Sequence, residues 1–196
     1  HKFTMPLSPK AQENIASTEA TRRTHLAQIA KTLDVPSFEL VVDFELLHED
    51  PLISSSDKNS LGAAVTDYVK SLDAKVKDVA KKNQDYVVQI KKLVHKNQVL
   101  FTVGPTDDGG VYYQLKIVDG QFVFIVPPDK MWTNASDAAS KLQALVDSMS
   151  GDCPPQLKLQ IRETEVQRIQ LLTTVSKALK LEQPYQLVCD YAAMYG

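Results

Sequence analysis

The segment from Asp57 to Lys96 carries the spacing of one long amphipathic helix. Its apolar residues recur at steps of mostly three and four, which places them on a single stripe of a helix. No proline interrupts the segment, and Asp57 or Ser60 could cap its first turn with a side-chain oxygen. The stripe consists of Leu61, Val65, Tyr68, Leu72, Val76, Val79, Tyr86, Ile90 and Leu93. We therefore expect a central helix around which both ends of the chain pack.

The length of this segment limits how it can fold. Roughly 38 helical residues would span nearly 60 Å at about 1.5 Å per residue, whereas a compact chain of 196 residues has a radius of gyration near ~16 Å. The helix must therefore project or break, and the break is expected at Asn83 and Gln84, where the stripe turns polar. Two alternatives remain: a coiled coil whose register a buried Asn83 sets, or the central helix of a bundle.

The distribution of charge along the chain limits the classes of partner that we expect. The central segment holds nine lysines and five aspartates, a net of +4, while the whole chain has a net charge of −2. A basic helix can attract phosphates, but these lysines lie largely off the stripe, as on a solvated face. We expect no nucleic-acid partner. Because no apolar run reaches about 18 residues, we also expect no membrane-spanning helix.

The N-terminal part is expected to form a helical hairpin over residues 9–50, after a loose end at residues 1–8. From Pro9 to about Asp34 the pattern is helical, and Pro36 ends it. Residues 37–47 fit a strand by their β-branched and aromatic content, but their spacing favours a second short helix. The apolar face of the first helix is formed by Ile15, Leu26, Ile29 and Leu33, and Arg22 shares that face.

After Asn97 the apolar period changes from that of a helix to that of strands. Strands are expected at residues 99–103, 111–117 and 121–126, and the last is apolar throughout, as in a strand buried on both faces. Asp119-Gly120 predicts a two-residue hairpin turn. We expect a three-stranded antiparallel meander, followed by a helix that ends near Met149 and completes a central unit of residues 57–150.

The two ends of the chain resemble each other. A shift of 146 positions aligns residues 9–33 with a predicted long helix after Pro155, and one inserted residue then aligns FELVVDF (38–44) with YQLVCDY (185–191). The identical pairs are Pro9/Pro155, Ile15/Ile161, Thr18/Thr164, Glu19/Glu165, Arg22/Arg168, Leu26/Leu172, Lys31/Lys177, Leu33/Leu179, Leu40/Leu187, Val41/Val188 and Asp43/Asp190. A C-terminal helical hairpin over residues 155–196, resembling residues 9–44, is therefore expected.

This similarity has three explanations. The two hairpins are an internal duplication that packs as a pseudo-symmetric pair, or they belong to a longer tandem array. The third explanation is that amphipathic helices look alike by chance.

No signature of catalysis, cofactor or metal binding occurs in the sequence. It contains no G-x-S-x-G, C-x-x-C or H-E-x-x-H motif and no phosphate-binding glycine loop. The cluster His48-Glu49-Asp50 fits no standard metal spacing. Cys153 and Cys189 are expected as buried thiols of a cytoplasmic protein, or as a disulfide if the protein is secreted with His1 as its mature N-terminus. We predict no catalytic residue, no cofactor and no metal site.

One apolar cluster is the candidate binding site. Tyr112, Tyr113, Met131 and Trp132 flank the end of the predicted sheet, and a tryptophan beside prolines can anchor a partner. The same tryptophan could instead plug the end of the core.

These observations predict an α+β fold that is mainly helical. The expected function is a non-enzymatic protein-interaction or scaffold module, with self-association and membership of a tandem-repeat protein as its two candidate forms. The alternative is a small-molecule binding protein or enzyme whose pocket lies between the sheet and the helices.

Overall fold

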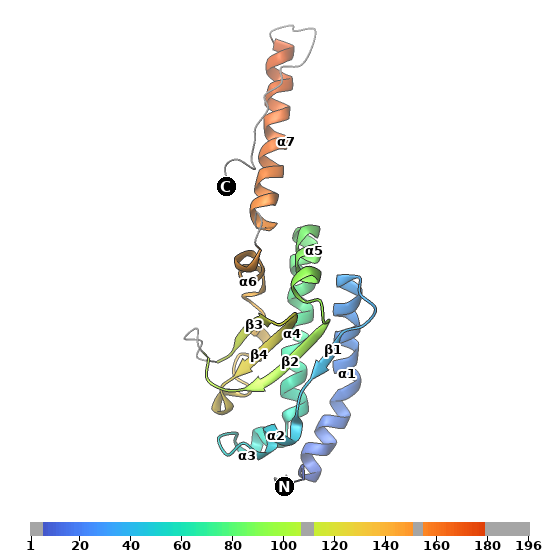
Figure 1. The fold of residues 1–196 in the computed structure, drawn as a ribbon, viewed down its shortest axis with the longest axis vertical. Coiled ribbons are helices and arrows are strands. Elements are labelled where there is room, and N and C mark those ends of the chain that lie inside the picture. The colour runs from blue at the N-terminus through green and yellow to red at the C-terminus, as the bar shows by residue number, and fades with distance from the viewer. Residues whose placement is uncertain (1–5, 107–111, 151–154, 179–196) are drawn as a thin grey trace. The chain divides into compact units, whose positions relative to one another are not determined.

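The central segment folds as three successive helices in the computed structural model, which describes residues 6–106, 112–150 and 155–178 (Figure 1). They are α3 (Ser55–Lys58), α4 (Leu61–Lys82) and α5 (Gln84–Leu93). The predicted break is confirmed: Asn83 has an extended backbone, with φ −158° and ψ 124°, and its side chain caps α5 by accepting from the N–H of Asp85. The stripe of α4 is buried within its own unit, so α4 is a core helix.

A four-stranded mixed sheet lies against the helices, in the order β1-β2-β4-β3. Its strands are β1 (Glu39–Val41), β2 (Gln98–Val103), β3 (Gln114–Val118) and β4 (Gln121–Val126). The β1–β2 and β2–β4 pairs are parallel, and β3–β4 is the antiparallel hairpin that Asp119-Gly120 predicted.

The predicted antiparallel meander is therefore only partly matched, because β2 pairs with β4 instead of β3. The strand order follows hydrophobicity. β4 is apolar almost throughout and takes a central place between β2 and β3, with Phe122, Phe124 and Val126 fully buried. The more polar β3 takes the edge. Residues 104–113 between β2 and β3 are also too many for a tight hairpin turn.

The N-terminal part of the chain contains a helix, a short strand and a second helix. α1 (Pro9–Leu33) begins at Ser8, whose side chain caps it, and ends at Asp34 in a left-handed conformation. The expected helix over residues 37–47 is wrong for its first half, which forms β1. The second half is α2 (Phe44–Glu49), capped by the Asp43 carboxylate. A free edge on β2 decided this, since β2 gives the β-branched segment a strand to pair with.

The remaining described helices follow β4. Two short 3-10 turns, η1 (Pro128–Lys130) and η2 (Ala135–Asp137), precede α6 (Leu142–Met149). The chain divides into two units after Met149, and the second contains α7 (Pro155–Ala178). The predicted C-terminal helix is confirmed as far as residue 178. The rest of the C-terminal hairpin, the turn at residues 107–110 and both cysteines lie outside the described residues.

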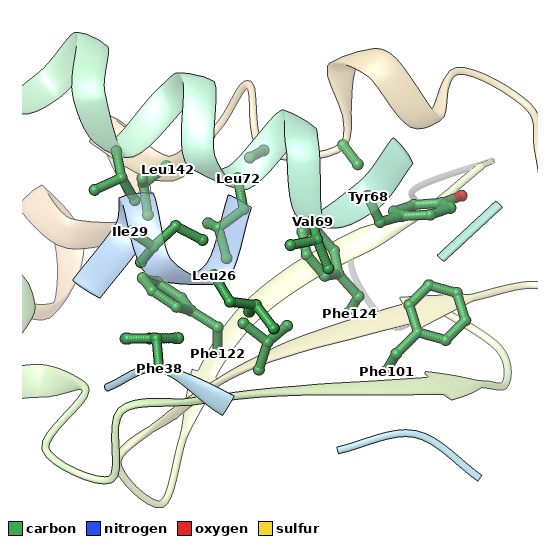
Figure 2. Packing of buried hydrophobic residues seen from close by; sticks show 14 of the residues in the cluster. Leu26, Ile29, Phe38, Tyr68, Val69, Leu72, Phe101, Phe122, Phe124 and Leu142 are labelled. Carbon is green, nitrogen blue, oxygen red and sulfur yellow. The ribbon is translucent and has the colours of Figure 1, made fainter. Parts of the chain in front are cut away.

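Aromatic rings fill the space between α4 and the sheet (Figure 2). Tyr68 of α4 is fully buried and packs edge-on against Phe101 and Phe124, with ring centroids 5.1 and 5.4 Å apart. Leu26 and Ile29 of α1 enter the same cluster. The first unit is thus a two-layer α+β fold in which α1 and α4 cover one face of the sheet.

Replacing Tyr68 by phenylalanine is expected to raise the free energy of unfolding at neutral pH by about 1 kcal/mol. The buried Tyr68 hydroxyl has no hydrogen-bond partner among the described residues, so its removal relieves a desolvation cost and leaves the ring packing intact. Chemical denaturation of both proteins measures the difference. A loss of stability in Tyr68→Phe would mean that this hydroxyl is hydrogen-bonded.

Tyr68→Phe should also change how the free energy of unfolding depends on pH. Burial raises the pKa of Tyr68 above the ordinary value of tyrosine, about 10. Its neutral form therefore contributes stability that is complete below about pH 10 and is lost as the pH rises towards the folded-state pKa. Tyr68→Phe should lose less stability above pH 10 than the wild type does. The pKa of Tyr86 is also raised, by burial and by Asp147, so part of the loss of stability above pH 10 remains in both proteins.

Candidate binding groove

A groove of about 670 Å³ lies between α1 and the segment that runs from Phe38 through β1 to Phe44. A second hollow of about 380 Å³ adjoins it and shares Arg23, Leu26 and Phe38 with it. We call the first one the α1–β1 groove. Its lining residues are Ile15, Glu19, Arg22, Arg23, Leu26, Phe38, Glu39, Leu40, Val42 and Phe44.

Arg22 is the buried cation of this groove, with only 5% of its surface exposed. Its guanidinium donates to the hydroxyl of Thr18 at 2.6 Å, to the carbonyl of Gly62 at 3.1 Å and to the carbonyl of Ile15 at 2.9 Å. A longer bond of 3.4 Å reaches the hydroxyl of Thr66. The charge also lies 5.3 Å from the centre of the Phe44 ring, on which it exerts a cation–π attraction.

All four hydrogen-bond acceptors of Arg22 are neutral. Burial lowers its pKa, and the negative charge of Glu19 opposes this effect, but an arginine still stays protonated. Glu19 forms its ion pair with the exposed Arg23. Of the described residues, none places a carboxylate within ion-pair distance of Arg22. Arg22 is therefore a buried cation without an ion pair among the described residues, in a groove whose lining also contains Arg23, Glu19 and Glu39.

The close approach of α1 and α4 explains why Arg22 can reach across. A Cβ atom at Gly62 would lie 2.5 Å from the hydroxyl of Thr18 and 2.6 Å from the Cα of Ile15. Only glycine permits this contact, and it exposes its carbonyl to the guanidinium. Thr66, one turn later, bonds the same carbonyl at 2.6 Å. Arg22 is thus held by α4 and is also a lining residue of the groove.

The other wall of the groove is a strand edge. β1 is the outermost strand of the described sheet and pairs only with β2. The N–H of Glu39 donates to the carbonyl of Asn97, on the β2 side. Because backbone groups alternate in direction along a strand, the N–H and carbonyl of Leu40 point to the open edge, beside the groove.

The residues predicted as a binding site do not gather around this groove. Met131 is buried with 1% exposed and plugs the core. Trp132, 37% exposed, donates its indole N–H to Asp67 at 3.0 Å. Tyr113 donates its hydroxyl to the carbonyl of Asp137 at 2.8 Å, and Tyr112 is 38% exposed.

The residue that the sequence analysis did not recognise as part of a binding site is Arg22. The signal that could have identified it is the presence of a cation within the apolar face of the first predicted helix.

A second polar cluster lies between α1 and α4. The buried Asp73 accepts at one oxygen from His25 at 2.8 Å and from Lys77 at 3.0 Å. His25 contacts no hydroxyl or thiol among the described residues, so the pair lacks the nucleophile that a catalytic triad needs. We assign it a structural role, in which His25 and Lys77 bond one oxygen of a carboxylate in the helix interface, while its other oxygen is buried without a partner among the described residues.

Comparison with known proteins assigns the chain to no family. No family model matches the chain, and neither a curated protein nor a solved structure resembles it significantly. None of the described helices is both long and apolar enough to cross a membrane. The described residues also contain no cluster of three or more side chains suited to hold a metal ion.

Proposed function

We propose that this protein is a non-enzymatic interaction module whose α1–β1 groove binds an extended, acidic segment of a partner protein. The observation that carries the proposal is that one groove contains both an open strand edge and a buried arginine that has no ion pair among the described residues. An extended segment that lies between an edge strand and a helix is an established mode of peptide recognition.

The strand edge supplies affinity that does not depend on sequence. A partner strand beside β1 would exchange main-chain hydrogen bonds with Leu40. Its alternate side chains would then face the apolar wall formed by Leu26, Phe38 and Phe44. An apolar wall with a few directional polar groups is the usual composition of a binding site.

The arginine supplies specificity. A carboxylate that reaches Arg22 would replace neutral acceptors with a charge-assisted hydrogen bond, which is roughly twice as strong. A lysine at the same place in the partner would meet uncompensated like charge. The preferred segment is therefore one with alternating apolar side chains and a central aspartate or glutamate.

The small-molecule alternative receives less support. It places a ligand between the sheet and the helices, where Tyr68, Phe101 and Phe124 already fill the space with ring-to-ring contacts. A ligand there would have to displace buried aromatic surface. The α1–β1 groove requires no such rearrangement.

The proposal is tested with two libraries of short peptides that alternate valine and threonine around a central residue. One library carries glutamate at the centre and the other carries lysine. We expect glutamate peptides to bind the full chain and lysine peptides to bind about tenfold more weakly or not at all. Arg22→Met should remove the difference between the libraries. Equal binding of both libraries to the wild type would contradict the proposal.

The strand edge is tested by a matched pair of variants. Leu40→Ala removes the side chain and keeps the N–H, whereas Leu40→Pro also removes the N–H that faces the open edge. Proline is tolerated at such a position of an edge strand. We expect peptide binding to be weaker in Leu40→Pro than in Leu40→Ala. If the two variants bind equally while both remain folded by circular dichroism, the peptide does not pair with β1.

A further inference from the structure

Helix α7 is the sequence counterpart of α1, and all of its described residues fall within the aligned segment. The shift of 146 positions carries the first residue of α1, Pro9, onto the first residue of α7, Pro155. The counterpart of Leu33, the last residue of α1, is residue 179, which lies just outside the described residues. The described part of α7 therefore lies within the segment aligned with α1.

The residues that the two helices share include those with which α1 holds α4. In α1, Ile15 and Thr18 form the surface against Gly62, and Arg22 bonds the Gly62 carbonyl. Their counterparts in α7 are Ile161, Thr164 and Arg168, which are identical. Leu26, buried beneath α4, corresponds to Leu172, and the buried Ile29 corresponds to Val175.

The corresponding face of α7 is open to solvent in part. Thr164 is exposed and Val175 is 39% exposed, whereas Ile29 at the place of Val175 in α1 is fully buried. Leu171 is 65% exposed. An apolar stripe with an arginine in its middle matches a docking face whose partner is a helix of the α4 kind.

We propose that α7 docks an α4-type helix of a second polypeptide, different from this chain. The partner helix carries a glycine opposite Thr164 and Arg168, with threonine or serine four residues later, as Gly62 and Thr66 do in α4. This inference rests on the repeated contacts of α1 and is independent of the α1–β1 groove.

One position at which α1 and α7 differ indicates which residue the partner helix carries. His25, which hydrogen-bonds one oxygen of the buried Asp73 of α4, is replaced in α7 by Leu171. An α4 helix docked on α7 would lose that hydrogen bond and bury a carboxylate beside leucine, which is costly. The partner helix therefore has an apolar residue where α4 has Asp73. The same mismatch disfavours a second copy of this chain, whose own α4 is also already covered by α1.

The test uses labelled peptides of residues 55–82 as probes and the full chain as receptor. One probe has the native sequence, the second carries Asp73→Leu, and the third carries Asp73→Leu with Gly62→Val. We expect saturable binding of the Asp73→Leu probe by fluorescence anisotropy, about tenfold tighter than that of the native probe. The added Gly62→Val should abolish binding, because it prevents close approach of the helices.

Two receptor variants locate the site. Leu172→Asp places a charge on the proposed face of α7 and should abolish binding of the Asp73→Leu probe. Val166→Asp lies on the opposite side of α7, is 56% exposed in the native chain and should leave binding unchanged. The proposal is overturned if the probe fails to bind, if Leu172→Asp binds normally, or if the native probe binds as tightly as the Asp73→Leu probe. Light scattering that shows a dimer broken by Leu172→Asp would also overturn it in favour of self-association.

Discussion

Replacing Gly62 by valine is expected to lower the free energy of unfolding by about 3 kcal/mol, the upper range for overpacking a core. A Cβ atom there would lie 2.5 Å from the Thr18 hydroxyl, 2.6 Å from the Cα of Ile15 and 2.7 Å from the carbonyl oxygen of Asn14. Two of these three atoms belong to the backbone of α1, which cannot turn aside as a flexible side chain can. Helices α1 and α4 would therefore have to separate along their shared interface.

The size of this effect is measured by chemical denaturation, with Gly104→Ala as the control. A Cβ atom at Gly104 would meet only the Ile125 side chain, at an ordinary contact distance of 3.8 Å. Its substitution should change stability far less. Gly62→Ala is informative as well, since alanine gains about 1 kcal/mol of helix propensity over glycine, yet we still expect a net loss. Wild-type stability in Gly62→Val would show that the helices do not cross at this glycine.

Two substitutions of Arg22 are expected to have unequal effects. Arg22→Ala should cost about 3 kcal/mol, because it removes the hydrogen bonds to Gly62 and Thr18 and leaves a cavity between α1 and α4. Arg22→Met keeps most of the side-chain volume and removes the cost of burying a charge. Its stability should lie within about 1 kcal/mol of the wild type, as for other buried charges replaced by apolar groups of similar size.

Denaturation curves of the two variants at neutral pH test this difference. If Arg22→Met is as unstable as Arg22→Ala, the charge itself stabilises the fold, and a structural explanation of Arg22 is sufficient. If Arg22→Met is stable, the fold does not require the charge. A stable Arg22→Met protein is then the appropriate variant for the peptide experiments on the groove.

Local patterns in the sequence were enough to predict the long helices and one hairpin. The steps of three and four between Leu61 and Val79 identified the buried face of α4, and the polar break at Asn83 identified the boundary with α5. Pro9 marked the start of α1, and Asp119-Gly120 marked the β3–β4 turn. Each of these features depends on a few neighbouring residues, and the residues themselves were sufficient to reveal it.

The candidate groove could not be predicted in this way. It depends on β1, a three-residue strand that exists because β2 offers it an edge, and on a distance between α1 and α4 that Gly62 sets. The sequence did show Arg22 among the apolar residues of α1. It did not show that the acceptors of this arginine would come from Thr66 and Gly62, forty and more residues away.

The sequence by itself determined where the long helices lie, which face of α4 is buried and where the β3–β4 turn lies, since these follow from side-chain periodicity and backbone preference. Only the tertiary structure decided the strand order and the parallel pairing of β2 with β4. It also decided that the segment before α2 begins as a strand. The physical reason is that strand pairing is made between distant residues, and its partner is selected by the burial of whole faces, which no local pattern records.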